Sequence, residues 1–265
     1  MKKKYLAAAA VLCAAALICG GIGIRNYLQE KNAGQGYEEI KKEVEKVEET
    51  EQEDTETDAA VIQQEDQTEN TVEVPIDFEA LKNKNPDAYA WIKIPGTQID
   101  YPILQSGTDN SYYLNHTIDH EEKTEGSIFT ENYNTKTFED PNTVIYGHDM
   151  KNGSMFQNLH NYMDRSFFDE NREVLIYLPD QILHYKIFAA YIYDNRHILQ
   201  SFDFGNKEIY QAYLDRIFSM RDMNSFVDTS MDITSEDKII TLSTCYAGIS
   251  SQRYLVQAVL ISIEK

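Results

Sequence analysis

Short runs of apolar, β-branched and aromatic residues alternate with polar segments that contain glycine or proline through the C-terminal two thirds of the chain. Runs of this length and composition, bounded by turn-forming residues, are typical of β-strands. Many short strands separated by loops favour a closed barrel over a parallel sheet. We therefore predict a mainly β fold, a closed eight-stranded β-barrel, with strands at residues 91–95, 99–104, 127–129, 143–147, 173–178, 184–193, 238–242 and 253–261.

A second pattern, with apolar residues at helical spacing, interrupts these strands. A short helix is expected to begin at Phe78, and further short helical segments are expected at residues 109–114 and 154–162. Residues 207–220 carry apolar side chains three to four positions apart, at Ile209, Tyr213, Ile217 and Met220. This spacing predicts a helix of about four turns, inserted before the strand at residues 238–242, with its apolar face packed on the barrel.

The N-terminus has the pattern of a membrane anchor. Three lysines at residues 2–4 precede about 20 uncharged, mostly apolar residues at 5–24, and Arg25 follows. A helix of this length spans a hydrocarbon core of about 30 Å, whereas the apolar region of a signal peptide is shorter. We predict a cytoplasmic tail at residues 1–4, a transmembrane anchor at 5–24 and, by the positive-inside rule, an extracellular remainder. A cleaved signal peptide is the alternative.

Residues 25–74 are rich in Glu, Lys, Gln, Thr and Asp, and they carry much of the formal net charge of −20. Such a segment buries too little apolar surface to offset its ordering entropy. We predict an acidic, largely disordered spacer, helical at most near residues 37–49, and a folded extracellular domain at residues 75–265. A partner-binding acidic tail is the alternative for the spacer. The net charge argues against nucleic acid as a partner.

Cys245 is the only cysteine outside the first 20 residues. An unpaired thiol is a liability in an oxidising exterior unless the protein uses it. A buried, inert cysteine is one interpretation, but Cys245 ends a predicted strand before a polar, glycine-containing loop, which favours exposure. Arg253 begins the next predicted strand eight residues later. The two residues are therefore expected at the facing ends of neighbouring strands.

A nucleophilic thiol needs a base or a cation nearby, because a free thiol is mostly protonated at neutral pH. His148 is the best placed of the six histidines, since it follows an apolar strand and the preceding Gly147 frees the backbone. Two strand ends can thus present His148 and Cys245 to one cleft. The other histidines are interpreted as surface loop or strand residues: His116, His120, His160, His184 and His197.

These residues together resemble a known family. The segments NTVIYGHDM and TLSTC, followed by Arg253, resemble the signature of sortases, the membrane-anchored cysteine transpeptidases of Gram-positive surfaces, and of class B sortases above all. The resemblance covers residues 78–261 and includes N-terminal helices and a helix before the cysteine strand. It implies that Cys245 attacks a threonine carbonyl in a C-terminal sorting signal to form a thioester, that His148 transfers protons, and that Arg253 stabilises the oxyanion.

The resemblance also implies five substrate contacts, from Asn110, Leu114, Tyr146, Ser243 and Thr244. Each has an ordinary alternative. Leu114 and Tyr146 fit a core, Asn110 and Ser243 fit structural hydrogen-bonding roles, and Thr244 fits an ordinary strand position. The short loop between the cysteine and the arginine leaves the wall of the site beside the thiol undefined.

The leading hypothesis is a class B sortase that joins secreted proteins to the amine of a peptidoglycan precursor or cross-bridge. Its partners would carry a C-terminal sorting signal containing proline and threonine, and its N-terminal helix would contact the membrane. A pilin-polymerising sortase, a hydrolytic cysteine protease and a non-catalytic membrane-tethered binding domain remain alternatives. No cofactor and no metal ion are expected, since the acidic pairs at residues 121–122 and 236–237 are interpreted as solvated loop residues.

Overall fold

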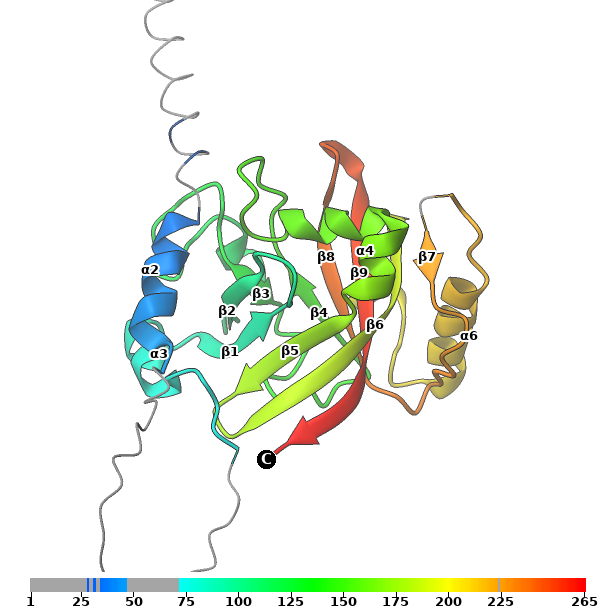
Figure 1. The fold of residues 1–265 in the computed structure, drawn as a ribbon, viewed down its shortest axis with the longest axis horizontal. Helices are drawn as coiled ribbons and strands as arrows, with labels where there is room; N and C mark the ends of the chain where they lie inside the picture. Colours follow the sequence, from blue (N-terminus) through cyan, green and yellow to red (C-terminus); the bar gives the residue numbers. More distant parts are fainter. Residues whose placement is uncertain (1–27, 29–30, 32–33, 47–71, 224) are drawn as a thin grey trace, which may run out of the picture.

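The fold is described from a computed structural model, which covers residue 28, residue 31 and residues 34–46, 72–223 and 225–265. The predicted cytoplasmic tail, transmembrane anchor and most of the predicted spacer lie outside the described residues. Within the described part of the chain, no helix has the length and apolar character needed to cross a membrane. Figure 1 shows a β-barrel with helices on its flanks.

Eight strands close on themselves, so the predicted eight-stranded barrel is confirmed. Their order around the barrel is β5-β1-β2-β3-β4-β8-β9-β6, and β6 pairs again with β5. A two-residue strand, β7 (Phe226–Val227), adds to the outer edge of β6 and was not predicted. The barrel strands are β1 Ala88–Lys93, β2 Asp100–Leu104, β3 Ile128–Thr130, β4 Asn142–Tyr146, β5 Glu173–Leu178, β6 Gln181–Asp194, β8 Ile239–Tyr246 and β9 Ile249–Glu264.

Parallel pairing between β4 and β8 is the feature of the barrel that places the site. The two strands run side by side in register from Asn142 opposite Ile239 to Tyr146 opposite Ser243. Parallel neighbours end at the same edge of a sheet, so the residues that follow them leave the barrel together. His148 comes two residues after the end of β4, and Cys245 lies two residues beyond Ser243. His148 and Cys245 therefore lie at the same edge of the barrel.

Helices flank the barrel in the order that the sequence predicts. The helix predicted from Phe78 is α3 (Phe78–Lys84), and the inserted helix is α6 (Lys207–Phe218), which lies between β6 and β8. The two short helical segments are confirmed as 3-10 helices, shorter or shifted by a few residues: η1 (Tyr112–Leu114) and η2 (Gln157–Met163). Two further short helices are present, α4 (Arg165–Glu170) and α5 (Ile198–Ser201).

The helix α2 (Gln35–Val44) lies close to the residues 37–49 where the sequence allows a helix, but it packs on the domain instead of forming part of a solvated spacer. Its residues Tyr37, Ile40 and Val44 are buried against the rest of the domain. The Tyr37 hydroxyl donates to the carbonyl of Gly126 over 2.7 Å, and Lys41 forms an ion pair of 2.6 Å with Asp100. The acidic composition of the segment led to the prediction of a solvated spacer. The narrow apolar stripe was overlooked because the glutamates occupy the opposite, exposed face of the helix.

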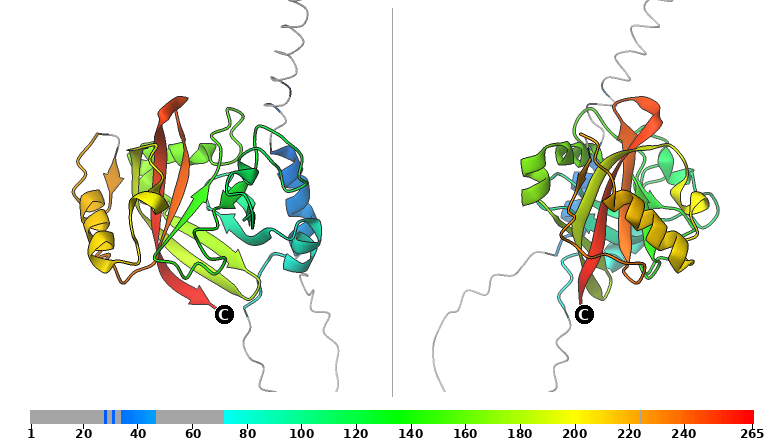
Figure 2. Two further views of the ribbon diagram at one scale, coloured as in Figure 1. Left: turned by 180° about the vertical axis from the view of Figure 1, so that it is seen from behind. Right: turned by 90° about the vertical axis from the view of Figure 1, so that its right-hand side faces the viewer.

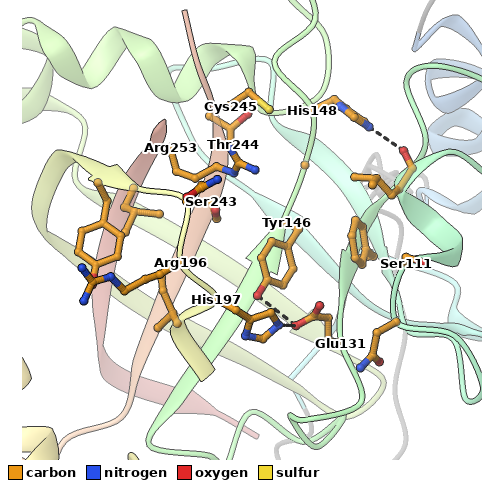
Figure 3. Close-up of a pocket in the computed structure, with 18 of the residues that line it drawn as sticks. Ser111, Glu131, Tyr146, His148, Arg196, His197, Ser243, Thr244, Cys245 and Arg253 are labelled. Atoms are coloured by element: carbon orange, nitrogen blue, oxygen red, sulfur yellow. Dashed lines mark hydrogen bonds and ion pairs between the residues drawn. The ribbon is translucent and has the colours of Figure 1, made fainter. Parts of the chain in front are cut away.

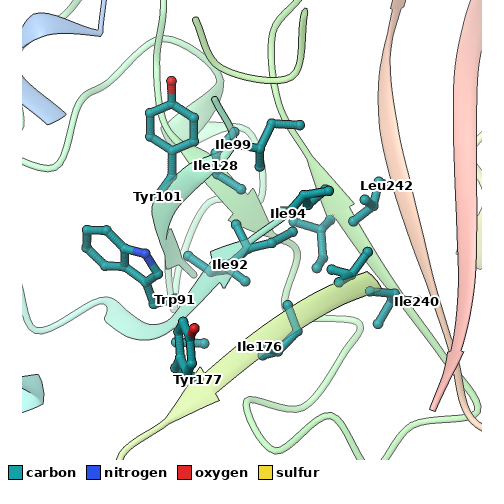
Figure 4. Packing of buried hydrophobic residues seen from close by; sticks show 14 of the residues in the cluster. Trp91, Ile92, Ile94, Ile99, Tyr101, Ile128, Ile176, Tyr177, Ile240 and Leu242 are labelled. Atoms are coloured by element: carbon teal, nitrogen blue, oxygen red, sulfur yellow. The ribbon is translucent and has the colours of Figure 1, made fainter. Parts of the chain in front are cut away.

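Two clusters of buried side chains hold the fold together. One joins the buried residues of α2 and α3 to those of the barrel strands, among which Trp91, Ile92 and Leu242 are fully buried (Figure 4). The other lies outside the barrel wall, where Phe188 and Tyr191 of β6 belong to one cluster with the buried face of α6. That face consists of Tyr210, Tyr213, Leu214 and Ile217, whereas Ile209 is exposed. The helices α2 and α6 thus cover opposite sides of the barrel (Figure 1 and Figure 2).

Candidate active site

Cys245 and Arg253 lie opposite one another in the β8–β9 hairpin. Their Cα atoms are register partners, and Tyr246 pairs with Ile249 at the tip. Only Ala247 and Gly248 form the turn, and both have a positive φ, of 46° and 70°. Two residues in this conformation match the twist of a tight hairpin. The polar loop predicted after the cysteine is therefore mostly strand, with a bulge between Cys245 and Tyr246.

The approach of His148 depends on the glycine before it. The Gly147 amide donates to the carbonyl of Ser243 over 3.1 Å, which extends the β4–β8 ladder by one step. A Cβ atom on residue 147 would lie 2.5 Å from Ile128 Cδ1 and 2.7 Å from Phe156 Cγ, too close for any other side chain without rearrangement. The glycine thus lets the chain pass the barrel wall and deliver His148 to the strand edge.

The three side chains expected to react with a substrate, those of Cys245, His148 and Arg253, make no hydrogen bonds to one another among the described residues. The Cys245 side chain is exposed and makes no hydrogen bond to any described residue. His148 Nε2 lies 2.6 Å from the Leu114 carbonyl, so this nitrogen must donate, and Figure 3 shows the ring directed towards that carbonyl rather than the thiol. Arg253 Nη1 donates to the carbonyls of Ser250 and Gln252 over 3.1 and 2.9 Å.

A pocket of about 240 Å³ joins these residues to the remaining predicted contacts. All eight residues predicted for the site line it: Asn110, Leu114, Tyr146, His148, Ser243, Thr244, Cys245 and Arg253. Cys245, His148 and Arg253 lie towards one end, and Tyr146 leads to a second polar group at the other (Figure 3). The structure therefore brings all of the predicted residues together from β4, β8, β9 and the segment before β3.

Comparisons with known proteins place this arrangement in a family. A model of the sortase domain matches residues 92–261. The chain belongs to the sortase family. It is 36% identical to sortase B of Listeria monocytogenes over 173 residues, which is 65% of this chain and 68% of the relative. Sortases of this type are cysteine transpeptidases, so the chain is an enzyme of that class.

Solved structures agree with the assignment to class B. Sortase B of Clostridium perfringens is similar, with a TM-score of 0.62 and 35% identity, over 70% of this chain and all of that one. A Staphylococcus aureus sortase B–substrate complex is similar with a TM-score of 0.61 and 32% identity, over 70% of this chain and 84% of that chain. The barrel, the helix α6 and the N-terminal helices therefore form a class B sortase domain.

The predicted contact residues of this sortase have different local roles. Leu114 is 49% exposed, which rules out the core alternative for this residue. Asn110 accepts a hydrogen bond of 2.8 Å from the amide of Asn132, so its side chain also has the structural role that the sequence left open. Ser243 and Thr244 are buried, and Thr244 Oγ1 has no hydrogen-bond partner among the described residues.

A second polar cluster of the sortase was missed by sequence reasoning. Glu131, directly after β3, accepts a hydrogen bond of 3.1 Å from the Tyr146 hydroxyl and lies 2.6 Å from His197 Nε2. Burial, and then the nearby Glu131 carboxylate, raise the pKa of Tyr146, so its hydroxyl stays a donor. The only sequence signal for His197 was its position just after β6. This strand ends at the same end of the barrel as β4 and β8.

His160, also interpreted from sequence as a surface residue, contacts the strand that carries Cys245. Its Nε2 atom lies 3.1 Å from the Cys245 carbonyl and must donate to it, and its Nδ1 atom lies 3.9 Å from Asp149. The imidazole also packs edge-on against Tyr254, with ring centroids 5.3 Å apart. His160 therefore bridges the loop that carries His148 and the strand that carries Cys245.

The acidic pairs in the loops of this sortase are partly engaged in ion pairs. Glu121 contacts Lys123 over 2.6 Å, and Glu236 contacts Lys207. Among the described residues, no group of three or more His, Cys, Asp or Glu side chains could hold a metal ion.

Proposed function

We propose that this sortase cleaves a C-terminal sorting signal after threonine and transfers the new C-terminus to an amine of the cell wall. The Cys245 thiolate attacks the threonine carbonyl, and the peptide bond breaks as the thioester forms. His148 gives its proton to the leaving amine and later removes a proton from the incoming amine. That amine displaces the thiolate, so the energy of the peptide bond is conserved in the new amide.

The observation that carries this proposal is the pairing of Cys245 with Arg253 across one hairpin, with His148 on the same pocket edge. A guanidinium stays charged and can offer two parallel donors to an oxyanion or a substrate carbonyl. Arg253 uses only Nη1 in the hydrogen bonds it makes within the described part of the chain. Its remaining donors can therefore serve a substrate beside the thiol.

The pocket also has unsatisfied polar atoms that suit a peptide. The Tyr193 hydroxyl and Thr244 Oγ1 are buried, line the pocket and lack hydrogen-bond partners among the described residues. Buried polar groups without partners are costly, so a bound chain that supplies donors and acceptors would be favoured. The similar Staphylococcus aureus structure is a complex of sortase B with its substrate, which supports a sorting signal as the ligand here.

We further propose that residues 5–24 anchor this sortase in the membrane with residues 1–4 in the cytoplasm. The uncharged run and the flanking lysines support this topology. The catalytic domain would then lie outside the cell, where secreted proteins and the amine of a peptidoglycan precursor or cross-bridge are both available. The part of the predicted spacer between α2 and α3, residues 47–71, remains a proposal of sequence alone.

The test is a transfer reaction with the full-length chain. Synthetic peptides that contain proline and threonine are incubated with the enzyme and with triglycine or hydroxylamine, and the products are identified by mass spectrometry. We expect a product that carries the amine on the threonine carbonyl and its absence with Cys245→Ala. A hydrolysed peptide alone would identify a protease, and intact peptide in every mixture would contradict an enzymatic role.

A further inference from the structure

The loop that carries His148 is closed at its base by backbone contacts. The Phe156 amide donates a hydrogen bond of 2.9 Å to the His148 carbonyl. Asp149 forms an isolated antiparallel bridge with Met155. The two ends of the loop at residues 148–156 are therefore joined directly. The backbone position of His148 consequently depends on the residues at the other end of the loop, Met155 and Phe156.

Met155 has a backbone conformation that residues with a side chain disfavour. Its φ of 57° lies in the left-handed region, where the Cβ atom crowds the following carbonyl oxygen. Such a conformation persists only where the surrounding structure holds it. The side chain of Met155 is buried, and its amide donates to the Tyr101 hydroxyl over 3.1 Å. A side chain of the barrel strand β2 thus holds the strained residue of the loop.

Tyr101 is itself held in place by α2. Its buried ring packs edge-on against Tyr37, with ring centroids 5.6 Å apart. The Tyr37 hydroxyl is fixed in turn by the Gly126 carbonyl and Ser127 Oγ, over 2.7 and 2.8 Å. Burial raises the pKa of Tyr101 to about 12, so its hydroxyl stays protonated at neutral pH. Figure 4 shows this hydroxyl directed away from Trp91, towards the outside of the cluster.

Under the proposed function the imidazole of His148 has to turn. Its Nε2 atom lies 2.6 Å from the Leu114 carbonyl, and proton transfer requires it to face a substrate bonded to Cys245. A displacement of about 1 Å in a reacting group can lower the rate by up to about 100-fold, even when its cause is distant. A fixed backbone at His148 limits the motion to rotation about the side-chain bonds, which keeps the imidazole within reach of the substrate.

We propose that Tyr101 is a positioning residue for His148. Its hydroxyl, by accepting from the Met155 amide, fixes the loop from which the imidazole reaches the substrate. The inference rests on the proposed function, because it needs His148 to transfer protons. Tyr101 lies outside the pocket lining, so it acts through Met155 and not by contact with the substrate or the thiol.

The experiment uses Tyr101→Phe in the full-length chain. The variant removes the oxygen that accepts from Met155 and keeps the ring against Tyr37. Transfer of a reactive sorting peptide to triglycine is followed by steady-state kinetics. We expect kcat to fall about tenfold and the peptide KM to stay within about twofold of wild type, because the reacting group is displaced while the pocket lining is kept.

Hydrogen exchange followed by mass spectrometry reports on the loop without any turnover. Peptides that cover residues 149–156 should exchange about tenfold faster in Tyr101→Phe, because the Met155 amide loses its partner and the loop opens more often. Peptides from β8 and β9 should exchange as in the wild type. A role in overall stability alone would instead raise exchange throughout the barrel and lower Tm, with kcat unchanged in the folded enzyme.

Tyr177→Phe is the matched control, since it removes the same atom from the same cluster. Tyr177 is buried on β5, and no hydrogen bond joins it to the loop among the described residues. The control should leave kcat, KM and the exchange of residues 149–156 unchanged. Thermal melting followed by circular dichroism checks that both variants fold.

The outcomes separate the inference from the proposed function. If the wild-type enzyme transfers the peptide and folded Tyr101→Phe has the same kcat, the inference is wrong and the proposed function stands. Unchanged exchange of residues 149–156, or an equal fall in kcat in Tyr177→Phe, also overturns it. If no peptide reacts with the wild-type enzyme, the proposed function fails and the inference fails with it.

Discussion

The two ends of the pocket differ in how their polar groups are satisfied. At the Glu131 end, the Tyr146 hydroxyl donates to one carboxylate oxygen, His197 Nε2 lies 2.6 Å from the same oxygen, and His197 Nδ1 accepts from the Gln200 amide. At the Cys245 end, the thiol has no hydrogen-bond partner among the described residues. His148 instead contacts the backbone of Leu114. One end is organised before a ligand arrives, and the other is not.

Under the proposed function, the Cys245 end reacts with the substrate and the Glu131 end contributes to binding it. Groups that recognise a ligand gain affinity when they are held in place beforehand, because less order is lost on binding. Groups that react often make long or poorly aligned contacts without substrate and tighten only in the complex. Variants at the thiol end should therefore lower kcat, whereas variants at the Glu131 end should act mainly on KM and on peptide choice.

Among the variants that keep Cys245, the largest effect is expected for His148→Ala. Loss of the group proposed to transfer protons should lower kcat by about 10²–10⁴-fold. Folding should be kept, because the one side-chain hydrogen bond that the structure gives this ring is to Leu114. Steady-state kinetics with a melting curve checks both. His184→Ala is the control: this histidine contacts Glu173 and Glu264, away from the pocket, and turnover should persist. Equal losses in the two variants would contradict the assignment.

The next largest effect is expected for Arg253→Lys. Its kcat/KM should fall about 100-fold, because an ammonium cannot reproduce the two-donor geometry of the guanidinium. Arg165→Lys is the control, since Arg165 pairs with Asp169 on the surface of α4. Peptide affinity in a Cys245→Ala background shows how much of the loss is binding. Near-normal turnover by Arg253→Lys would refute a role for paired donors at the thiol end.

His160→Phe tests whether the link to the Cys245 carbonyl positions the nucleophile. The variant keeps an aromatic ring against Tyr254 and removes the Nε2 donor. We expect kcat to fall about tenfold with little change in KM, since a small displacement of a reacting group slows the reaction without weakening peptide binding. His160→Gln, which can still donate, should recover part of the loss. A rise in KM alone, or equal losses in the two variants, would contradict this role.

The smallest effect is expected for Tyr146→Phe at the other end of the pocket. The change removes one of the two contacts on Glu131 Oε2 and keeps the ring. Peptide KM should rise about two- to fivefold at nearly constant kcat, the usual size for one hydrogen bond. Tyr89→Phe is the control, because it loses a hydrogen bond to Thr130 outside the pocket lining. If Tyr146→Phe lowered kcat and left KM unchanged, the proposed difference in role between the Cys245 end and the Glu131 end would be wrong.

The barrel could be predicted from sequence because each strand carries its own signal. Apolar runs such as residues 173–178 are bounded by polar turns, and β5 has the predicted bounds. The helix α2 was missed as part of the domain because its apolar stripe of Tyr37, Ile40 and Val44 is diluted by glutamates. Average composition describes a segment, whereas burial depends on one face of a helix.

The site was predictable where the family motifs mark the residues, at the ends of β4 and β8 and in the segment before β3. The parallel pairing of β4 with β8 brings His148 and Cys245 to one edge, as two aligned strand ends suggest. The contact between Glu131 and His197 joins residues far apart in sequence, after β3 and after β6. Neither residue has a local pattern that marks it. Such pairs follow from the closure of the barrel rather than from any segment.

The most direct test of the central claim is the intact mass of the enzyme after brief incubation with a reactive sorting peptide. The account predicts a mass increase equal to the N-terminal part of the peptide, ending in threonine and attached to Cys245. This adduct should be absent from Cys245→Ala and should disappear when triglycine is added, as the triglycine-bearing product forms. Cleavage of the peptide by Cys245→Ala, or turnover by the wild-type enzyme without an adduct that triglycine consumes, would contradict it.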